Sequence, residues 1–172
     1  MWFNHTLVGI VCLAVSACGF QPLYGTGSES RVIADFSRVQ VAPMKDRVGQ
    51  QLHNELERLL HPGGAAPRYA YRLKAELNEG TSSLAVKKSA FATRGNLTVT
   101  AKYTLLDSTT GQSVLGASNA ITVSYNIFSS EFETLMAEKD ARKRAVRELA
   151  QEIRIRLGVY LRDPPKVPLR AS

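Results

Sequence analysis

Apolar and polar residues alternate along three segments in the middle of the chain, at residues 68–77, 96–105 and 115–126. A period of two residues puts one set of side chains on a buried face of a sheet and the other set on a solvated face. Residues 109–112 join the last two segments, and Gly111 can take the positive φ that a tight turn requires. The pattern therefore predicts three strands of one half-buried sheet, the last two forming a hairpin.

Two other segments repeat with the period of a helix. Val48, Leu52, Leu56 and Leu59 lie on one helical face, after Asp46 as the expected N-cap. A longer helix is predicted from a capping box, with Ser130 as N-cap and Glu133 at the third position, to about Leu161. Its apolar stripe comprises Leu135, Ala141, Ala145, Leu149, Ile153 and Leu157.

Residues 32–41 are rich in β-branched side chains and are predicted to form the first strand. The element order is then β-α-β-β-β-α. This order predicts an α+β fold: a two-layer sandwich of a four-stranded sheet with both helices packed on its apolar face. Between Gly80 and Gly95 apolar residues repeat with neither the period of a strand nor that of a helix, and we expect a loop there.

The first seventeen residues contain no Lys, Arg, Asp or Glu, and an apolar run covers residues 7–15. This pattern is typical of a secretory signal peptide, and the run is shorter than the roughly 20 residues of a transmembrane helix. Val15, Ser16 and Ala17 precede Cys18, as in the bacterial lipobox, in which the cysteine is acylated. The alternative is an ordinary signal peptide followed by an incidental cysteine.

The cysteine count favours acylation. Of the two cysteines, Cys12 would be removed with the signal, which leaves Cys18 alone at the start of the mature chain. A lone thiol outside the cytoplasm is open to oxidation, and acylation protects it. We therefore predict a signal peptide at residues 1–17, a lipidated Cys18 with a flexible tether to residue 30, one domain at residues 31–161, and a disordered tail at residues 162–172.

The chain has 22 basic and 15 acidic residues, a net charge of +7. For an exported protein this suggests an anionic lipid or a phosphorylated glycan as ligand and argues against nucleic acid; the alternative is that the charge only maintains solubility. Lys87, Lys88 and Arg94 flank the expected loop without obvious acidic neighbours. The cations of the long helix are instead offset by acids four residues away.

No catalytic constellation is evident. His53 and His61 are expected to be solvated residues at the first helix, and no phosphate-binding glycine loop, nucleophile elbow or metal-spaced Cys/His set occurs. We expect neither an enzyme nor a cofactor.

Several segments together resemble the LptE family of lipopolysaccharide-assembly lipoproteins. Residues 18–24 read CGFQPLY, residues 93–105 read TRGNLTVTAKYTL, and residues 137–145 and 148–154 read AEKDARKRA and ELAQEIR. The resemblance covers the mature chain up to about Leu161. The signal differs from the usual pattern in having no Lys or Arg before its apolar run.

The resemblance implies a lipoprotein on the periplasmic side of the outer membrane that partners the β-barrel LptD and inserts lipopolysaccharide into the outer leaflet. Gly19 fits sorting to that membrane. By the same resemblance, Lys87 or Lys88 and Lys139 are candidates for binding lipopolysaccharide. Arg94 is added because the predicted hairpin places it at the same end of the sheet as Lys139. The polar sheet face is the candidate surface for the barrel, through Thr98, Thr100, Lys102, Thr122 and Ser124. The alternatives are a lipoprotein that scaffolds another envelope complex without a lipid ligand and, less favoured, a secreted hydrolase.

Overall fold

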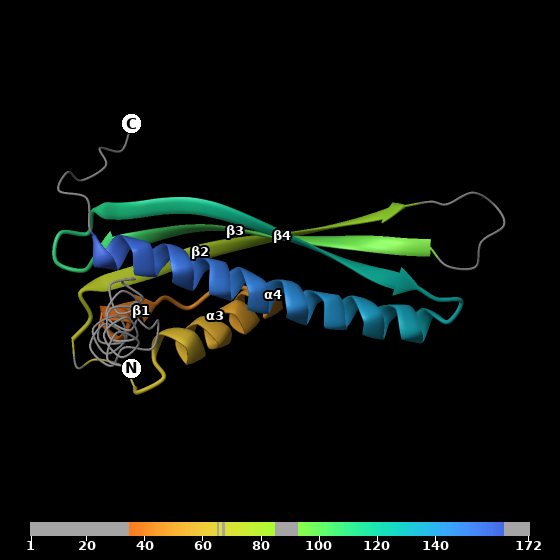
Figure 1. The fold of residues 1–172 in the computed structure, drawn as a ribbon, viewed down its shortest axis with the longest axis horizontal. Coiled ribbons are helices and arrows are strands. Elements are labelled where there is room, and N and C mark those ends of the chain that lie inside the picture. Colours follow the sequence, from red (N-terminus) through yellow and green to blue (C-terminus); the bar gives the residue numbers. More distant parts are fainter. Residues whose placement is uncertain (1–34, 65, 67, 85–92, 164–172) are drawn as a thin grey trace, which may run out of the picture. The chain divides into compact units, whose positions relative to one another are not determined.

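The computed structural model describes residues 35–64, 66, 68–84 and 93–163. The chain divides into two units, Met1–Ser30 and Arg31–Ser172, and every described residue belongs to the second. Cys18, Lys87 and Lys88 lie outside the described residues, as do the predicted signal, the tether and most of the tail. The elements of the second unit are β1 (Val39–Val41), α3 (Arg47–Leu60), β2 (Tyr71–Leu84), β3 (Thr93–Asp107), β4 (Ser113–Ile127) and α4 (Glu131–Arg162) (Figure 1).

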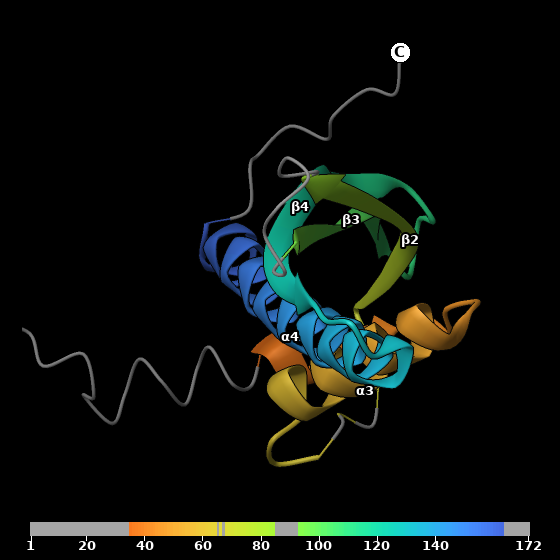
Figure 2. The same ribbon diagram turned by 90° about the vertical axis from the view of Figure 1, so that its right-hand side faces the viewer.

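The four strands form one sheet in the order β1-β2-β3-β4. β1 pairs with β2 in parallel, and the other two pairs are antiparallel. Figure 2, which looks along the strands, shows both helices on the same side of the curved sheet. The predicted α+β fold, with its element order and its two helices on one sheet face, is confirmed.

The core lies between the helices and β3. All five helix-facing residues of this strand from 97 to 105 are buried, and they meet a buried stripe on α4. The stripe comprises Ala141, Ala145, Val146, Leu149, Ala150, Ile153 and Leu157. α3 adds Leu52, Leu56 and Leu60, each with no exposed surface, while Val48 and Leu59 of its predicted stripe are partly buried against the core.

The first strand is much shorter than predicted. Of its described residues, 35–37 are helical and Val39–Val41 pair with β2 at Tyr71–Leu73, while residues 32–34 lie outside the described residues. The prediction was wrong there because Phe36 is a core residue: its ring packs on Gly158 and under the Arg154 guanidinium of α4. A helical turn places this ring in the core, and such a turn has no alternation of apolar and polar residues in its sequence.

The expected loop between Gly80 and Gly95 is strand at both of its ends, and residues 85–92 lie outside the described residues. β2 continues to Leu84 and β3 begins at Thr93, with Gly80 opposite Thr98 and Leu84 opposite Arg94. The hydrogen bonds between strands join backbone groups and do not require alternating side chains. Because Gly, Ser and Thr occupy both faces here, the sequence shows no alternation, and the extension of the hairpin was not predicted.

The helix ends agree with the sequence in part. The Ser130 side chain accepts the Glu133 N–H, as a capping box requires, and Gly111 has φ +71° in the β3–β4 turn. Asp46 does precede α3, but its side chain makes no capping hydrogen bond and its φ is +67°.

His61 is not the solvated residue that was expected. Its side chain is only 5% exposed, with Nδ1 2.6 Å from a carboxylate oxygen of Glu57 and Nε2 2.9 Å from the carbonyl oxygen of Val39. His53 is half-buried, and its Nδ1 has no hydrogen-bond partner in the part of the chain that the structure describes. His61 thus ties the end of α3 to β1, a structural role.

Leu149→Asp is expected to lower the free energy of unfolding by about 4 kcal/mol or more, because it places an unpaired charge among fully buried side chains. Thr100→Asp, on the opposite face of the sheet, should leave the domain folded. Thermal unfolding followed by circular dichroism measures both. Unfolding of the Thr100 variant would contradict the assignment of the two sheet faces.

Candidate functional site

The face of the sheet away from the helices is lined with hydroxyl and amide side chains. The register places Thr98 opposite Thr122 and Lys102 opposite Ser118, so the five residues predicted to face a partner share one surface. Thr98 and Thr100 are half-buried, and Lys102, Thr122 and Ser124 are exposed. The structure therefore brings together the surface that the alternation predicted.

Hydrogen bonds between neighbouring strands hold this polar face in order. The hydroxyl oxygens of Thr98 and Thr122 lie 2.8 Å apart, and the Ser124 hydroxyl donates to the Asn96 amide oxygen at 2.7 Å. Such cross-strand pairs fix side-chain positions on the sheet. The face is thus an ordered array of donors and acceptors.

Near the turn between β3 and β4, part of this surface is hollowed. Gly116 leaves a gap beside Lys102 and Ser118, within a hollow of about 520 Å³ that extends to Lys74 and Glu76 of β2. Glu76 lies directly opposite Lys102 in the ladder. The hollow has room for a side chain from a partner and presents charges of both signs.

Arg94 lies at the other end of the sheet, in a cavity of about 290 Å³ between β4 and α4. Tyr125 and Arg144 also line this cavity. A Cβ on Gly95 would be 2.6 Å from the Tyr125 ring, so only glycine lets the ring lie across β3 here. The sequence missed Arg144, which was assigned to the solvated helix surface.

The four predicted lipopolysaccharide-binding residues are placed only in part. Arg94 does lie next to α4, against residues 137, 140 and 144, but Lys139 is exposed and does not line the cavity. Asp140, which does line it, pairs with Arg144 at 2.9 Å. Lys87 and Lys88 lie outside the described residues. The structure therefore places Arg94 and Lys139 near the same stretch of α4 without a shared pocket.

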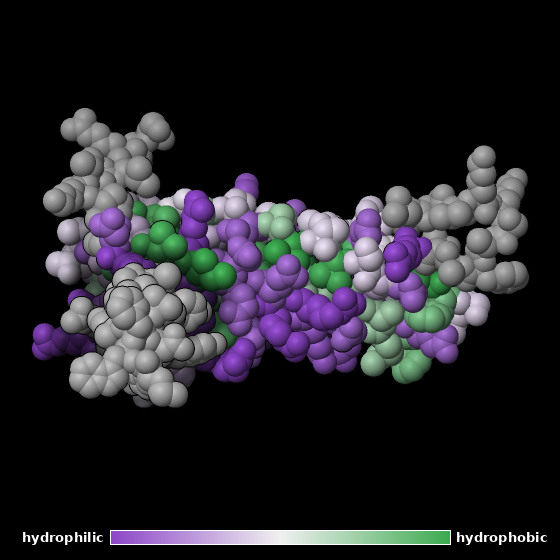
Figure 3. All heavy atoms as spheres, viewed as in Figure 1, coloured by the Kyte–Doolittle hydropathy of each residue, from purple (hydrophilic) through white to green (hydrophobic). Residues whose placement is uncertain are grey.

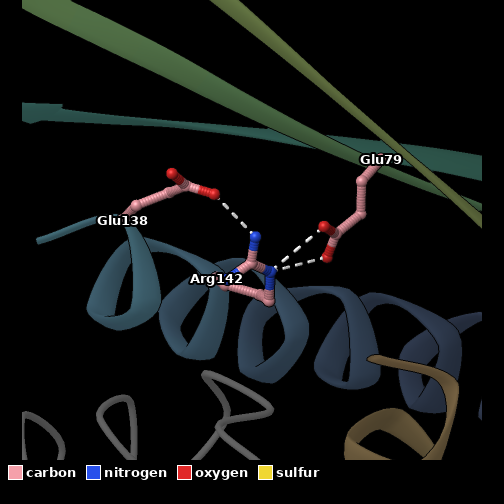
Figure 4. Close-up of polar contacts among 3 residues, drawn as sticks. All are labelled: Glu79, Glu138 and Arg142. Carbon is pink, nitrogen blue, oxygen red and sulfur yellow. Dashed lines mark hydrogen bonds and ion pairs between the residues drawn. The ribbon is translucent and has the colours of Figure 1, made fainter. Parts of the chain in front are cut away.

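Arg142 is held within the fold. Its Nε donates to both carboxylate oxygens of Glu79 on β2 at 2.9 and 3.1 Å, and its Nη2 donates to Glu138 at 2.7 Å (Figure 4). Partial burial opposes the charged form, but these hydrogen bonds outweigh it and raise the pKa of Arg142. Together with the Asp140–Arg144 pair, this confirms that acids four residues away offset cations on this helix. Arg142 is a bridge between β2 and α4.

The first turns of α4 carry an exposed apolar patch. Leu135 was predicted to be part of the buried stripe but is 59% exposed, and Phe128, Phe132 and Met136 are exposed with it. The reason is that the ends of β2 and β3 diverge from α4 here, so that only the end of β4 lies beside the first turns of the helix (Figure 1). Figure 3 shows this patch over the first turns of the helix.

The described residues contain no group of His, Cys, Asp and Glu side chains that could hold a metal ion. Within the same residues, no helix is both long and apolar enough to span a membrane.

Solved structures share this fold. A candidate lipoprotein from Caulobacter crescentus CB15 superimposes with a TM-score of 0.65 at 21% identity, covering 78% of this chain and 98% of its own. The minor lipoprotein from Acinetobacter baumannii has a TM-score of 0.54 at 14% identity, covering 72% and 94%. A comparison with curated proteins gives no match.

The family comparison is decisive. The family model LptE, described as lipopolysaccharide-assembly, matches residues 36–157, more than half of the chain. These residues run from the core ring of Phe36 to the last buried residue of α4, so they span the fold described above. The chain belongs to the LptE family of lipopolysaccharide-assembly lipoproteins.

Proposed function

We propose that this protein is anchored in the outer membrane by an acylated Cys18 and partners an LptD-like β-barrel in inserting lipopolysaccharide into the outer leaflet. In this role it has no catalytic activity of its own. The barrel supplies the passage, and this chain occupies part of the barrel lumen and contacts the lipid.

The polar face of the sheet is the observation that carries the proposal. The lumen of an outer-membrane barrel is lined with polar side chains and water. Thr98, Thr122 and Ser124 offer hydroxyl groups held in place by cross-strand hydrogen bonds, which suits a polar wall better than an apolar one. Lys102 adds a cation on the same surface.

Binding of lipopolysaccharide is a second part of the proposal. Phosphates on the lipid headgroup accept charge-assisted hydrogen bonds from Lys and Arg. No ion pair is formed by Arg94 or Lys139 among the described residues, which leaves both cations available, unlike Arg142. Lys87 and Lys88 complete the proposed set.

The main alternative is an envelope lipoprotein that scaffolds another complex without a lipid ligand. Purification of the full chain from detergent-solubilised membranes separates the two functions. Recovery of a large β-barrel protein supports the proposal, and recovery of other envelope proteins without a barrel favours the scaffold.

Thr100→Asp should reduce the amount of co-purified barrel roughly tenfold or more, because an unpaired charge buried in an interface costs a few kcal/mol. Gln50→Asp puts the same charge on an exposed position of α3 and is the matched control. Equal barrel recovery with both variants would exclude the polar sheet face as the contact surface.

Cys18→Ser should abolish acylation and leave the precursor uncleaved by the lipoprotein-specific peptidase. Labelling of growing cells with a radioactive fatty acid measures this, with the wild-type chain as reference. Equal label in both proteins would refute anchoring through Cys18.

Changing Lys87, Lys88, Arg94 and Lys139 together to Glu should weaken lipopolysaccharide binding about tenfold or more at low salt, since each exposed ion pair contributes less than about 1 kcal/mol. The difference should shrink as salt increases. The control changes four other exposed cations to Glu, namely Lys45, Arg47, Arg68 and Arg162. If both variants bind lipopolysaccharide equally well while the barrel still co-purifies, Lys87, Lys88, Arg94 and Lys139 only solvate the surface.

A further inference from the structure

β4 lies at the end of the sheet, and β3 is its one hydrogen-bonded neighbour within the described residues. It is 15 residues long and contains no Lys, Arg, Asp, Glu or Pro. An edge strand offers a row of unpaired backbone groups, and natural proteins usually block it with charges, prolines, bulges or very short strands. Except for a bulge near its start, opposite Leu105 and Leu106, β4 has none of these.

The register shows which backbone groups face outward. The Tyr71 N–H donates to Arg38, and the Leu73 carbonyl accepts the Ala42 N–H, so odd-numbered residues of β2 point toward β1. Backbone groups alternate in direction along an antiparallel strand. Even-numbered residues pair with even-numbered ones and odd with odd in both ladders, except at the bulge, where Leu106 is opposite Ser113. In β4 the odd-numbered residues therefore bond to β3, and the outward N–H and C=O groups belong to Ser118, Ala120, Thr122 and Ser124.

The opposite edge of the sheet differs. β1 covers β2 only at Tyr71–Leu73, and the uncovered part of β2 carries Lys74, Glu76 and Glu79. Charges of this kind discourage pairing with another strand. Of the two long edges that the described residues form, that of β4 is the uncharged one, so it lacks the charges that discourage strand pairing.

An apolar groove runs beside this open edge on the helix side. Ile155 and Val159 of α4 are 60% and 66% exposed, and with Leu115 of β4 they line a hollow of about 390 Å³. The charged residues Glu152, Arg156 and Asp163 line the same hollow, so its apolar side chains have charged neighbours. Side chains of a strand added to β4 would alternate between this groove and the polar face. The groove therefore selects an extended segment with apolar residues at every second position.

We infer that the β4 edge binds an extended segment of the partner barrel as a fifth strand of the sheet, with its apolar side chains against Ile155 and Val159. This inference rests on the proposed function. The wall strands of a closed barrel have no free edge, so the segment comes from a loop or a terminal region of the barrel protein. Main-chain hydrogen bonds give such contacts their affinity, and the groove gives them specificity.

A second copy of this chain fits the edge less well. Because α4 runs antiparallel to β4, a two-fold β4–β4 pair would set Ile155 and Val159 of one copy toward the first half of α4 in the other. Asp140 and Arg144 are exposed there. Apolar side chains would then face charges.

Photo-crosslinking of the full acylated chain in cells tests the inference. A photoreactive residue at Val159 should capture the barrel protein, and Ala120→Pro should lower this capture about tenfold, because proline removes an outward N–H and blocks the approach of a strand. Proline is tolerated at an edge position whose N–H faces solvent. Ala75→Pro is the control, since by the same register Ala75 points away from β3 at the charged edge of β2.

Hydrogen exchange on the purified complex gives a second measurement that needs no variant. The amides of residues 118–124 should exchange more slowly in the complex than in the free chain, while those of residues 74–79 at the β2 edge serve as the reference. Strand addition is wrong if the barrel co-purifies but Ala120→Pro leaves its capture at Val159 unchanged and residues 118–124 exchange equally fast in the complex and in the free chain. The barrel partnership would stand in that case. Capture of a second copy would also overturn the inference, whereas absence of the barrel from the wild-type preparation would refute the proposed function itself.

Discussion

The packing of α4 on β3 is the contact on which the rest of the structure depends. Leu97, Val99, Ala101 and Leu105 are fully buried on one side of this strand, against the buried stripe of α4. Burial of such a face contributes about 25 cal/mol for each Å² of apolar surface removed from water. Since the helices cover this face along residues 97–105 of β3, the other face of the sheet is left to polar contacts. The candidate partner surface is thus a consequence of where the core lies.

The packing of α4 on β3 also determines which part of the helix is buried and which part is exposed. The sheet supports the helix from Ala141 onward, and Arg142 bridges β2 and α4 through Glu79 at the point where the apolar packing begins. Before that point only the end of β4 lies beside α4, and Leu135 and its neighbours are exposed. The end of the molecule that holds Arg94 therefore also presents apolar side chains. An amphiphilic ligand with a charged headgroup would find both kinds of contact there.

Open edges follow from the strand order. A sheet that does not close leaves two outer strands, and here β1 is too short to cover β2 beyond Leu73. Charges occupy the uncovered part of β2, whereas β4 is uncharged and has an apolar groove beside it. Two surfaces of the same sheet, the polar face and the β4 edge, are thus available to partners through different chemistry: side-chain hydroxyls on one and backbone groups on the other.

The sequence by itself determined the element order, the two sheet faces, the apolar side of α3 and the apolar stripe of α4 from Ala141 onward. It could do so because the periods of strands and helices reflect which side chains are buried. It also predicted the family to which the chain belongs. The tertiary structure alone decided the extension of the β2–β3 hairpin, the core position of Phe36, the burial of His61 and the exposure of Leu135. Each of these depends on a neighbour distant in the chain: a paired strand, Gly158 of α4, the Val39 carbonyl, or a sheet that diverges from its helix. A local sequence pattern does not indicate contacts with residues that are distant in the chain. For the same reason, only the structure shows that Arg144 lines the same cavity as Arg94.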